Sequence, residues 1–583
     1  MTTPSTMAAI TGANAVASTT AIARSTRLPR LTNSLNSAIR LFTVLFSSTA
    51  WGGWRWRSQA QLLRSDTRLR SQRVPDRLPR RSRDRPREGL MGSQTFDLVV
   101  IGMGSAGTLA AEFAARDLGL KVAAVERDRV GGDCLWTGCV PSKTLVASAR
   151  VAHTVRHAAR YGIGGGEPDV DLHAVWARIA AVRNGIAATD DDPERFRELG
   201  VELVFGTARV TGAREVTVTN HSTPSRSGDA GERVLATRHV LICTGSRPTV
   251  PAIAGLADVP YLTNEQLFDL DRPPSSLVLI GGGPIGAELS QSMVRLGVPT
   301  TMFESAPRLL PRDEPELADR ITRILRDEGV EIHLGSPVIE VTQVSGSAGA
   351  DSQHGAGVSV RSDDAEVTAA AVVVTAGRTA NVESLGLERF GIPVSTDGIS
   401  VDGRSRTIVP TISAVGDAAA GRHRFTHSAG YDAVMAVRDM FFPGRGLAAG
   451  LVPWCTFTDP ELAHVGMTAA EARESFGKRS VEVHRHEVSD LDRARADGRL
   501  PGAIIIVTAK GRIVGAHALA PTAGELIHEL ALAIRFGLDL DDLSQLVHIY
   551  PTYATGIAQI AAERSFRTGH RFRVLTRLSR WLG

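Results

Sequence analysis

The 583-residue sequence has few cysteines, few aromatic residues and no apolar run that approaches a membrane span. Short apolar runs such as residues 41–46 fall far below the roughly 20 residues that a membrane-spanning helix needs. Four cysteines are too few for a disulfide framework and indicate a reducing compartment, which predicts a cytoplasmic protein. These shortages exclude integral-membrane, collagen-like and disulfide-scaffold classes. The 43% of apolar residues predicts a soluble globular protein, with three or more folding units at this length.

Lysine is absent from residues 1–90, which carry 16 arginines against four acidic residues and so hold a net charge of +12. The rest of the chain carries −8, so the overall charge of +4 does not indicate nucleic-acid binding, and we predict no nucleic-acid partner. Because residues 1–93 show no repeated apolar period, we interpret them as a disordered basic extension. Two other interpretations stay open: an organelle transit peptide, and translation that starts at Met91.

A strand–turn–helix–strand pattern occurs twice along the chain. In the first copy, the apolar run 96–101 precedes a glycine cluster, a helical stretch to about Gly119 and a strand at 121–125. The second copy begins with the apolar run 277–280 and ends in a strand through Phe303. Two such units predict an α/β fold with two Rossmann-like dinucleotide-binding domains. The mixed pattern near the C-terminus predicts a third domain, of α+β type.

Gly102, Gly104 and Gly107 form a G-x-G-x-x-G motif between the first strand and its helix. The first glycine permits a tight turn, the second lets the backbone approach a pyrophosphate, and the third lets the helix pack against the strand. The start of the helix offers unpaired N–H groups to the phosphates. Glu126 follows the motif at the distance where an acid accepts a hydrogen bond from a ribose hydroxyl. Together these features predict a dinucleotide site.

Gly281, Gly283 and Gly286 repeat the motif in the second unit, and Glu304 takes the place of the acid. A carboxylate there repels a 2′-phosphate, so the pattern favours NADH over NADPH. Arg308, four residues further on, weakens this preference, and the choice between NADH and NADPH stays open.

Cys134 and Cys139 are separated by four residues. In a regular helix their Cα atoms would lie roughly 8–9 Å apart, whereas a disulfide needs less than about 7 Å. Either the two cysteines are unrelated core residues, or the backbone between them is distorted, which Gly138 would allow.

Residues 131–143, Gly-Gly-Asp-Cys-Leu-Trp-Thr-Gly-Cys-Val-Pro-Ser-Lys, resemble the redox-active loop of the flavoprotein disulfide reductases, the pyridine nucleotide–disulfide oxidoreductase family. The chain resembles this family from about Phe96 to Arg564, in the same order and with the same spacing. Three further segments carry the resemblance: Thr-Gly-Ser-Arg-Pro at 244–248, Gly-Arg at 377–378, and Ala-Val-Gly-Asp at 414–417.

The resemblance implies FAD at the first motif and NADH or NADPH at the second. It implies that Cys139 lies against the flavin, that Cys134 is the interchange thiol facing the substrate, and that Lys143 lies near the flavin with Glu288 as its ionic partner. The implied FAD-binding residues are Gly102, Gly104, Gly107, Glu126, Lys143, Ala208, Thr244, Gly245, Ser246 and Asp417. The implied nicotinamide-nucleotide residues are Gly281, Gly283, Gly286, Glu304 and Gly377. No resident metal is predicted.

The same resemblance implies a homodimer with a C-terminal dimerisation domain. The predicted divisions are a basic extension (1–93), the FAD domain in two parts (94–250 and 379–449), the NAD(P) domain (251–378), the dimerisation domain (450–566) and a basic tail (567–583). Polar stretches at 220–232 and 344–357 predict surface loops. The tail has apolar residues at helical spacing among arginines, which a solvated end or a membrane-surface helix would both explain.

The C-terminal motif departs from the family pattern. Members that exchange dithiols end in His-Pro-Thr-x-x-Glu, where the histidine is the base for the interchange thiol and the glutamate orients it. Here Tyr550 replaces the histidine and Thr555 replaces the glutamate. The resemblance implies that the residues around Tyr550 complete the active site of the partner subunit. A phenol is a poor base at neutral pH. His548 either substitutes for the missing base or is simply packed or solvated.

These departures decide the predicted acceptor. The C-terminal cysteine pair of mercuric reductase is also absent, and Cys243 and Cys455 are most simply core residues. We therefore predict an FAD-dependent NAD(P)H oxidoreductase whose acceptor is a metal ion such as mercuric ion, a quinone or a small disulfide. The alternative is a dihydrolipoamide dehydrogenase, and from another class a redox-inactive flavin-binding structural subunit.

Overall fold

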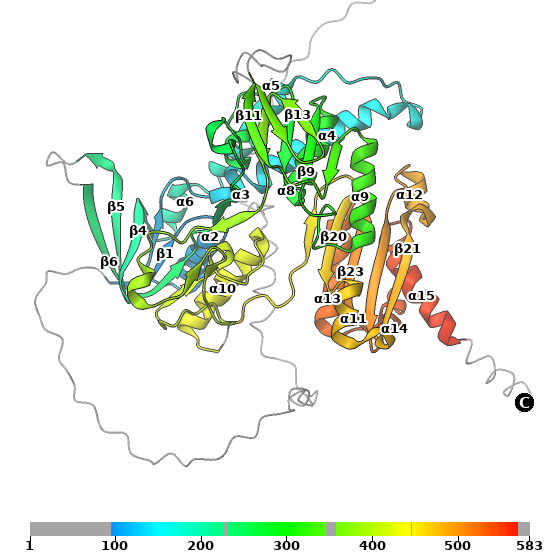
Figure 1. Ribbon diagram of the computed structural model, residues 1–583. Helices are drawn as coiled ribbons and strands as arrows, with labels where there is room; N and C mark the ends of the chain where they lie inside the picture. The colour runs from blue at the N-terminus through cyan, green and yellow to red at the C-terminus, as the bar shows by residue number, and fades with distance from the viewer. Residues whose placement is uncertain (1–94, 225–229, 345–356, 445, 570–583) are drawn as a thin grey trace, which may run out of the picture. The chain divides into compact units, whose positions relative to one another are not determined.

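The computed structural model describes residues 95–224, 230–344, 357–444 and 446–569 (Figure 1). The predicted basic extension, the middle of both predicted loops and nearly all of the basic tail lie outside the described residues, and so do the interpretations placed on them. None of the described helices is both long and apolar enough to cross a membrane.

The first sheet is built around β1 (Phe96–Ile101). Its parallel part has the order β3-β2-β1-β6-β18, and its antiparallel part is the meander β4-β5-β6. The bounds are β2 (Val122–Glu126), β3 (Val201–Phe205), β4 (Thr207–Gly212), β5 (Glu215–Pro224), β6 (Ala230–Ile242) and β18 (Ile412–Ala414). Strand β6 belongs to both parts, because its first half pairs with β5 and its second half with β1 and β18.

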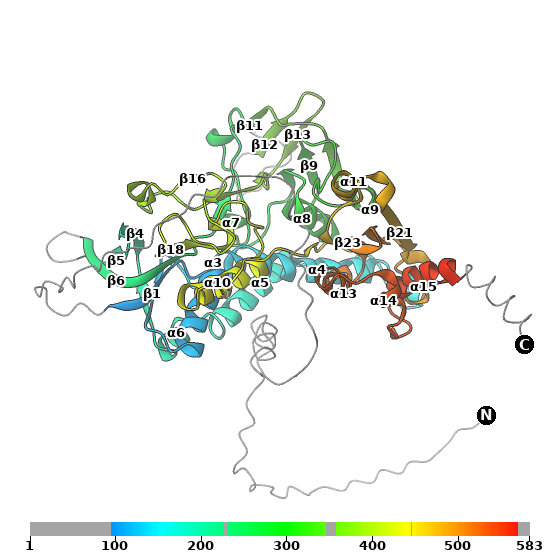
Figure 2. The ribbon, with the colours of Figure 1, turned by 90° about the horizontal axis from the view of Figure 1, so that it is seen from below.

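Side chains alternate across this sheet, as the two-residue period of a strand requires. Leu98 and Val100 of β1 pack with helices α2 and α10 on one face, while Val99 and Ile101 pack on the other face against the meander. The helices on this sheet are α2 (Ser105–Glu112), continued by a π-helical turn (Phe113–Asp117), α6 (Pro193–Glu198) and α10 (Thr426–Phe441). Figure 1 shows α10 beside α2, and Figure 2 shows α10 from below.

The second sheet repeats the same architecture in smaller form, with four parallel strands in the order β10-β9-β8-β14. Its bounds are β8 (Leu277–Ile280), β9 (Thr300–Glu304), β10 (Glu331–Leu334) and β14 (Ala371–Val374). One face packs against α8 (Pro284–Arg295) and α9 (Pro315–Asp327). The other face packs against an antiparallel sheet of β11 (Glu340–Val344), β12 (Gly357–Arg361) and β13 (Glu366–Ala369).

The third large sheet is antiparallel, with the order β19-β20-β23-β22-β21. Its bounds are β19 (Trp454–Thr456), β20 (Glu461–Gly466), β21 (Val481–Glu487), β22 (Ala503–Ala509) and β23 (Arg512–Ala520). Ile504 and Ile506 face α13 (Ala523–Phe536) and α15 (Thr555–Gly569), whereas Ile505 and Val507 join the core around the second sheet. Both faces of this sheet are therefore covered.

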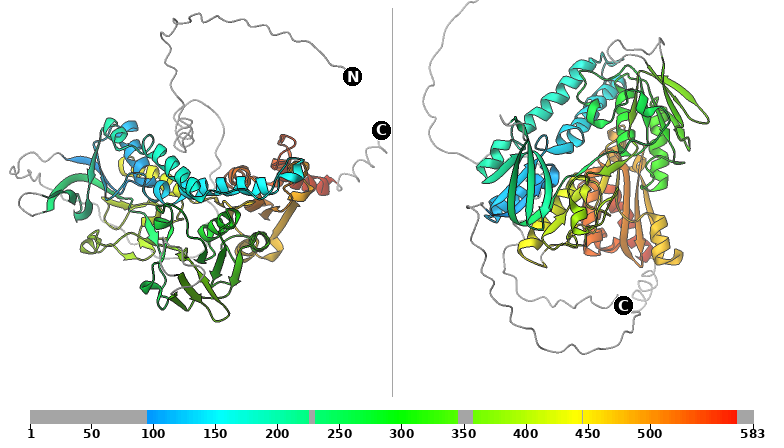
Figure 3. Two further views of the ribbon diagram at one scale, coloured as in Figure 1. Left: turned by 90° about the horizontal axis from the view of Figure 1, so that it is seen from above. Right: turned by 60° about the vertical axis from the view of Figure 1, so that its left-hand side comes forward.

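Two long helices, α4 (Cys139–Arg156) and α5 (Leu172–Ala187), lie side by side, as the views in Figure 3 show. Helix α4 also packs against α8, so the segment that begins at Cys139 reaches the second sheet. The short helices are α3 (Gly132–Trp136), α7 (Asn264–Leu267), α11 (Ala469–Phe476), α12 (Asp492–Ala496) and α14 (Leu540–Ser544). The described residues also form two small strand pairs: β7 (Ser246–Pro248) with β15 (Arg378–Ala380), and β16 (Val394–Ser395) with β17 (Gly398–Ile399).

These sheets confirm the predicted α/β fold with an α+β C-terminal part. The predicted loop at 220–232 is too long, because β5 extends to Pro224 and β6 begins at Ala230, with these two residues paired. The pairing of β5 with β6 thus extends the two strands into a stretch whose polar composition predicts a loop. The exact domain boundaries stay a prediction.

Candidate active site

The first glycine motif forms a tightly packed turn at the end of β1. Gly102 has φ +95°, and a Cβ on Gly107 would lie 1.8 Å from the carbonyl oxygen of Gly102, so neither position accepts a side chain. Gly104 precedes α2, and no side chain caps this helix start. A Cβ on Gly132 would lie 2.7 Å from the Gly104 Cα. The unpaired N–H groups of the first turn therefore remain available to a phosphate.

The second glycine motif has the same construction at the end of β8. Gly281 has φ +115°, and a Cβ on Gly286 would lie 2.1 Å from its carbonyl oxygen. Gly283 precedes α8, which also begins without a side-chain cap, and a Cβ there would meet no atom within 4 Å. Both motifs therefore present an uncapped helix start beside a glycine turn, which fits two pyrophosphate groups.

The two predicted ribose acids occupy equivalent places. Glu126 Oε2 accepts a hydrogen bond from the Met103 N–H at 2.7 Å, and Glu304 Oε2 accepts one from the Gly282 N–H at 2.6 Å. Each carboxylate is thus held against its glycine turn by backbone groups, and its remaining lone pairs can accept from a ribose hydroxyl. Arg308 Nε lies 3.1 Å from Asp319 Oδ1, so this cation already has an acidic partner.

The helical conformation is interrupted between Cys134 and Cys139. Helix α3 ends at Trp136 and α4 begins at Cys139, and a Cβ on Gly138 would lie 2.9 Å from the Asp133 carbonyl oxygen. Of the two possibilities that the spacing left open, the chain therefore adopts the distorted backbone. Both cysteines are free thiols.

The two thiols have opposite acidities. The hydrogen bond from Cys134 lowers the pKa of Cys139 to about 6, against the effect of burial and with help from the positive charge of Lys143. Donating that hydrogen bond raises the pKa of Cys134, and burial raises it further. The Thr426 hydroxyl, at the start of α10, lies 3.5 Å from the Cys139 Sγ. The lower pKa of Cys139 therefore makes it the thiolate of the pair, which accepts a hydrogen bond from the Cys134 thiol.

Lys143 and Glu288 form a close ion pair, with Nζ 2.6 Å from Oε2. Burial acts to lower the pKa of Lys143, but Glu288 and Cys139 outweigh it and raise the pKa overall. The second oxygen of Glu288 accepts from the Phe457 N–H at 2.9 Å, and the Phe457 ring centroid lies 4.6 Å from Lys143 Nζ. The Lys143 ammonium group, which α4 carries, is therefore held by Glu288 of α8 and by Phe457, which follows β19.

Thr244, Gly245, Ser246 and Asp417 lie in one polar cluster between the first sheet and β15. Ser246 Oγ donates to Asp417 Oδ2 at 2.6 Å, and burial raises the pKa of that carboxyl. Gly245 has φ +69°, and the Thr244 hydroxyl donates to the Asn381 carbonyl oxygen at 2.6 Å. These hydrogen bonds fix the cluster on the segments that leave the first sheet.

Arg378 is the residue of this cluster that sequence reasoning passed over. Its Nε donates to Ser246 Oγ at 2.7 Å, and its Nη2 lies 2.8 Å from Asp133 Oδ2, beside the cysteine pair. The Gly-Arg motif at 377–378 was the available signal. Gly377 has φ +106°, and its carbonyl oxygen accepts from the Thr249 N–H at 2.9 Å. Ala208 is buried in β4 within the core of the first sheet, so only its backbone has polar groups to offer.

Tyr550 lies in the C-terminal part of the fold, after α14, and 67% of its surface is exposed. Its hydroxyl donates to Asp492 Oδ2 at 2.7 Å, and this hydrogen bond raises the pKa of the phenol. The shift is in the wrong direction for a base at neutral pH. Thr555 is engaged locally, since its hydroxyl accepts from the Thr552 N–H at 3.3 Å.

The side chain of His548 is packed against residues of its own chain. Its side chain is 7% exposed, Nε2 lies 2.9 Å from Glu529 Oε1, and Nδ1 lies 3.2 Å from the Leu546 carbonyl oxygen. Both ring nitrogens therefore face oxygen atoms of the same chain, and neither is directed toward a thiol. The geometry favours the packed histidine over the substitute base.

The other two cysteines differ from each other. Cys243 is buried, and burial raises the pKa of its thiol. Cys455 is half-buried and packs against the core of the third sheet, and burial together with Glu461 and Glu288 raises the pKa of its thiol. Among the residues that the structure describes, no three His, Cys, Asp or Glu side chains are grouped to hold a metal ion.

Two dinucleotide motifs lie on separate parallel sheets, and a dithiol lies beside a half-buried ion pair. Together they define a nucleotide-dependent redox protein. Residues 96–433 match the family described as pyridine nucleotide-disulphide oxidoreductase, and residues 452–561 match its dimerisation domain. The chain belongs to this family of flavoprotein oxidoreductases, which depend on FAD and a pyridine nucleotide.

Named relatives fall into several activities. The chain is 31% identical to a dihydrolipoyl dehydrogenase of Chlorobaculum tepidum over 80% of its own length and 96% of the relative's. It is 32% identical to a mercuric reductase of Streptomyces lividans, again over 80% of the chain and 96% of the relative. Its structure is similar to a Cu(II) complex of RclA, a HOCl-induced flavoprotein disulfide reductase from Escherichia coli (TM-score 0.68, 26% identity, covering 81% of this chain and 99% of that one).

Proposed function

We propose that this chain is an FAD-containing NAD(P)H oxidoreductase that passes electrons from the nicotinamide, through flavin and the Cys134–Cys139 pair, to a terminal acceptor. The acceptor is a metal ion such as mercuric ion, a quinone or a small disulfide. The observation that carries this is the low-pKa Cys139 thiol at the broken helix, beside the Lys143–Glu288 pair.

The residues present fit both nucleotides. The uncapped starts of α2 and α8, with the glycines that keep them free of side chains, would hold the two pyrophosphates. Glu126 and Glu304 would hold the riboses, and the cluster around Asp417 would hold the chain between flavin and phosphate. FAD, when bound, supplies the chemistry that turns a hydride into an electron pair for the disulfide.

The protein's own groups manage charge and protons. When the Cys134–Cys139 disulfide accepts an electron pair, the S–S bond breaks and two sulfur atoms each gain negative charge. The high pKa of Cys134 makes it the sulfur that takes a proton, while Cys139 stays a thiolate. Lys143 stabilises that thiolate electrostatically, and Glu288 keeps the ammonium group in place.

The choice of acceptor follows from what surrounds Tyr550. Its raised pKa and the packed ring of His548 leave neither residue as a base for proton transfer at the interchange thiol. A soft metal ion bound by thiolates, or a quinone, needs no such base. Dihydrolipoamide dehydrogenase remains the second candidate, because the chain is 31% identical to a relative of that name over most of its length.

The test is a turnover screen with NADH and lipoamide, mercuric ion, cupric ion and quinones as acceptors. We expect rapid NADH oxidation with a metal ion or a quinone and slow oxidation with lipoamide. Rapid lipoamide turnover would favour the dehydrogenase instead. Failure of both NADH and NADPH to bleach the flavin would leave only the hypothesis of a structural subunit.

Nucleotide preference depends on Glu304. We expect a higher kcat/KM for NADH than for NADPH, and Glu304→Ala should narrow the gap because the carboxylate no longer repels a 2′-phosphate. Glu304→Gln, which keeps an acceptor for the Gly282 N–H, should narrow it with less loss of NADH binding. Asp319→Asn should act in the same direction by freeing Arg308. A preference for NADPH in the unmodified protein would show that Arg308 governs the pocket.

The proposal includes a homodimer in which the region of Tyr550 completes the partner's site. The match to the dimerisation domain supports it, and so do the exposed apolar side chains of Val547 (93%) and Ile549 (80%) beside Tyr550. The low cysteine content agrees with a cytoplasmic location.

A further inference from the structure

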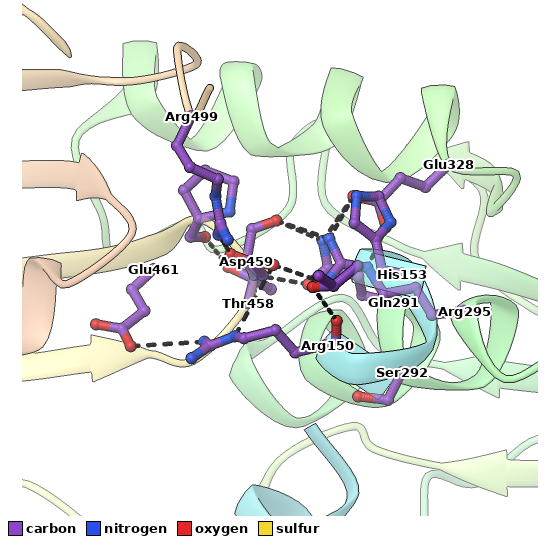
Figure 4. Close-up of polar contacts among 12 residues, drawn as sticks. Arg150, His153, Gln291, Ser292, Arg295, Glu328, Thr458, Asp459, Glu461 and Arg499 are labelled. Carbon is purple, nitrogen blue, oxygen red and sulfur yellow. Dashed lines mark hydrogen bonds and ion pairs between the residues drawn. The ribbon is translucent and has the colours of Figure 1, made fainter. Parts of the chain in front are cut away.

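Asp459 is a buried acid at the centre of a charged cluster (Figure 4). Its side chain is 3% exposed and lies between three arginines from different elements: Arg295 at 2.8 Å, Arg150 at 3.9 Å, and Arg499 as a direct ion pair. Glu328 balances part of this charge, since its Oε2 lies 2.6 Å from Arg295 Nε. A buried carboxylate with this many cations fixes the segment that carries it.

Helix α8 holds the backbone of the same segment. The Asp459 N–H donates to Gln291 Oε1 at 2.7 Å, and the Asp459 carbonyl oxygen accepts from Gln291 Nε2 at 2.9 Å and from Arg295 at 3.1 Å. Glu288, Gln291 and Arg295 are spaced by three and four residues, which places them on one face of α8. This face therefore contacts residues 457–459 along its whole length.

The same segment holds the predicted catalytic cation. The Phe457 N–H binds Glu288 Oε1, its ring lies 4.6 Å from Lys143 Nζ, and Asp459 is only two residues further on. We propose that Gln291 and Asp459 are positioning residues for the Lys143–Glu288 pair, acting through the backbone of residues 457–459. The inference rests on the proposed function, in which Lys143 stabilises the Cys139 thiolate.

Positioning and plain electrostatics predict opposite results. The groups that face Cys139 are Cys134 from α3, Lys143 from α4, Glu288 from α8 and Thr426 from α10. If the segment shifts, the Phe457 N–H leaves Glu288, the carboxylate neutralises Lys143 more fully, and the Cys139 thiolate loses stabilisation. If Asp459→Asn acted only by removing a negative charge, the three arginines would favour the thiolate instead.

The experiment uses the holoenzyme with Cys134→Ser, in which the Cys139 thiolate can be titrated by its long-wavelength charge-transfer absorbance with flavin. Gln291→Met is added as a variant without a change in formal charge, and Asp459→Asn as the second variant. We expect each to raise the pKa of Cys139 by about one unit, a tenfold fall in the thiolate-to-thiol ratio at a given pH. Leu325→Ala, which removes a buried side chain of α9, is the control: it should lower the melting temperature and leave this pKa unchanged.

The outcomes separate the two proposals. Absence of the band in Cys134→Ser alone would reject the assignment of Cys139 and hence the proposed function. Two results would reject the positioning role while leaving the proposed function intact. One is a pKa of Cys139 that is the same in Gln291→Met as in its parent, and the other is a pKa of Cys139 that falls in Asp459→Asn. If Gln291→Met does not fold, the sign of the shift in Asp459→Asn decides.

Discussion

Replacing Tyr550 by His together with Thr555 by Glu is expected to raise lipoamide-dependent NADH oxidation by roughly 100-fold, since a positioned base contributes typically 10²–10⁴-fold. In the unmodified chain the Tyr550 phenol donates to Asp492, its pKa is raised, and it accepts no proton at neutral pH. A histidine there would supply the missing base. Thr555 begins α15, so a glutamate at this position would start a helix, where an acidic side chain is favourable.

The single variants separate the two roles. Thr555→Glu alone should change lipoamide turnover little, because it orients a base that is absent. Tyr550→His alone should give part of the gain. The measurement is steady-state NADH oxidation with lipoamide, with the rate of flavin reduction by NADH as the internal reference that none of these variants should change.

His548→Gln is the control, since it keeps polar contact with Glu529 while removing any titratable ring. It should leave lipoamide turnover as it is. Rapid lipoamide turnover in the unmodified protein that His548→Gln abolishes would show that His548 is the base, and dihydrolipoamide dehydrogenase would become the better proposal.

The second large effect is complete loss of the long-wavelength thiolate–flavin absorbance in Cys139→Ser. A serine hydroxyl stays protonated in the pH range where Cys139, with a pKa of about 6, is a thiolate. Cys134→Ser should keep the absorbance, because a serine hydroxyl still donates to the Cys139 sulfur. In this variant the absorbance should be present at high pH and disappear as the pH falls through the pKa of Cys139, since the thiolate is the absorbing form.

Cys243→Ser and Cys455→Ser are the matched thiol controls for this experiment. Cys243 is buried away from the pair, and Cys455 borders Lys143 without contributing to the charge that favours the thiolate. Neither variant should remove the long-wavelength absorbance. An unchanged band in Cys139→Ser would reassign the flavin contact to another thiol.

Local chemistry explains what the sequence could predict. The glycine turns and the two acids Glu126 and Glu304 lie within 24 residues of the backbone groups that they contact, so a motif with fixed spacing contains them. Gly138 was recognisable because a broken helix needs a residue that tolerates close approach. The partner of Lys143 came from resemblance alone, because Glu288 is 145 residues away in the sequence.

Long-range contacts were beyond such reasoning. Nothing near Phe457 or Asp459 indicates that their backbone meets α8, since those contacts span 164 to 169 residues. The contact between Tyr550 and Asp492, and the half-exposed place of Cys455, likewise depend on how the third sheet packs. Whether another residue takes over the role of a substituted one, as His548 could for the histidine that Tyr550 replaces, is visible only in the folded chain.

The ion pair between Lys143 and Glu288 also limits how the protein can move. Glu288 lies on a helix of the second sheet, yet its carboxylate binds α4 with one oxygen and the chain after β19 with the other. A hinge that swung the second sheet away from the first would strip a buried carboxylate of both partners at once, which is costly. The Glu288 carboxylate therefore opposes such a hinge, because both of its contacts would have to be replaced before the second sheet could separate from α4.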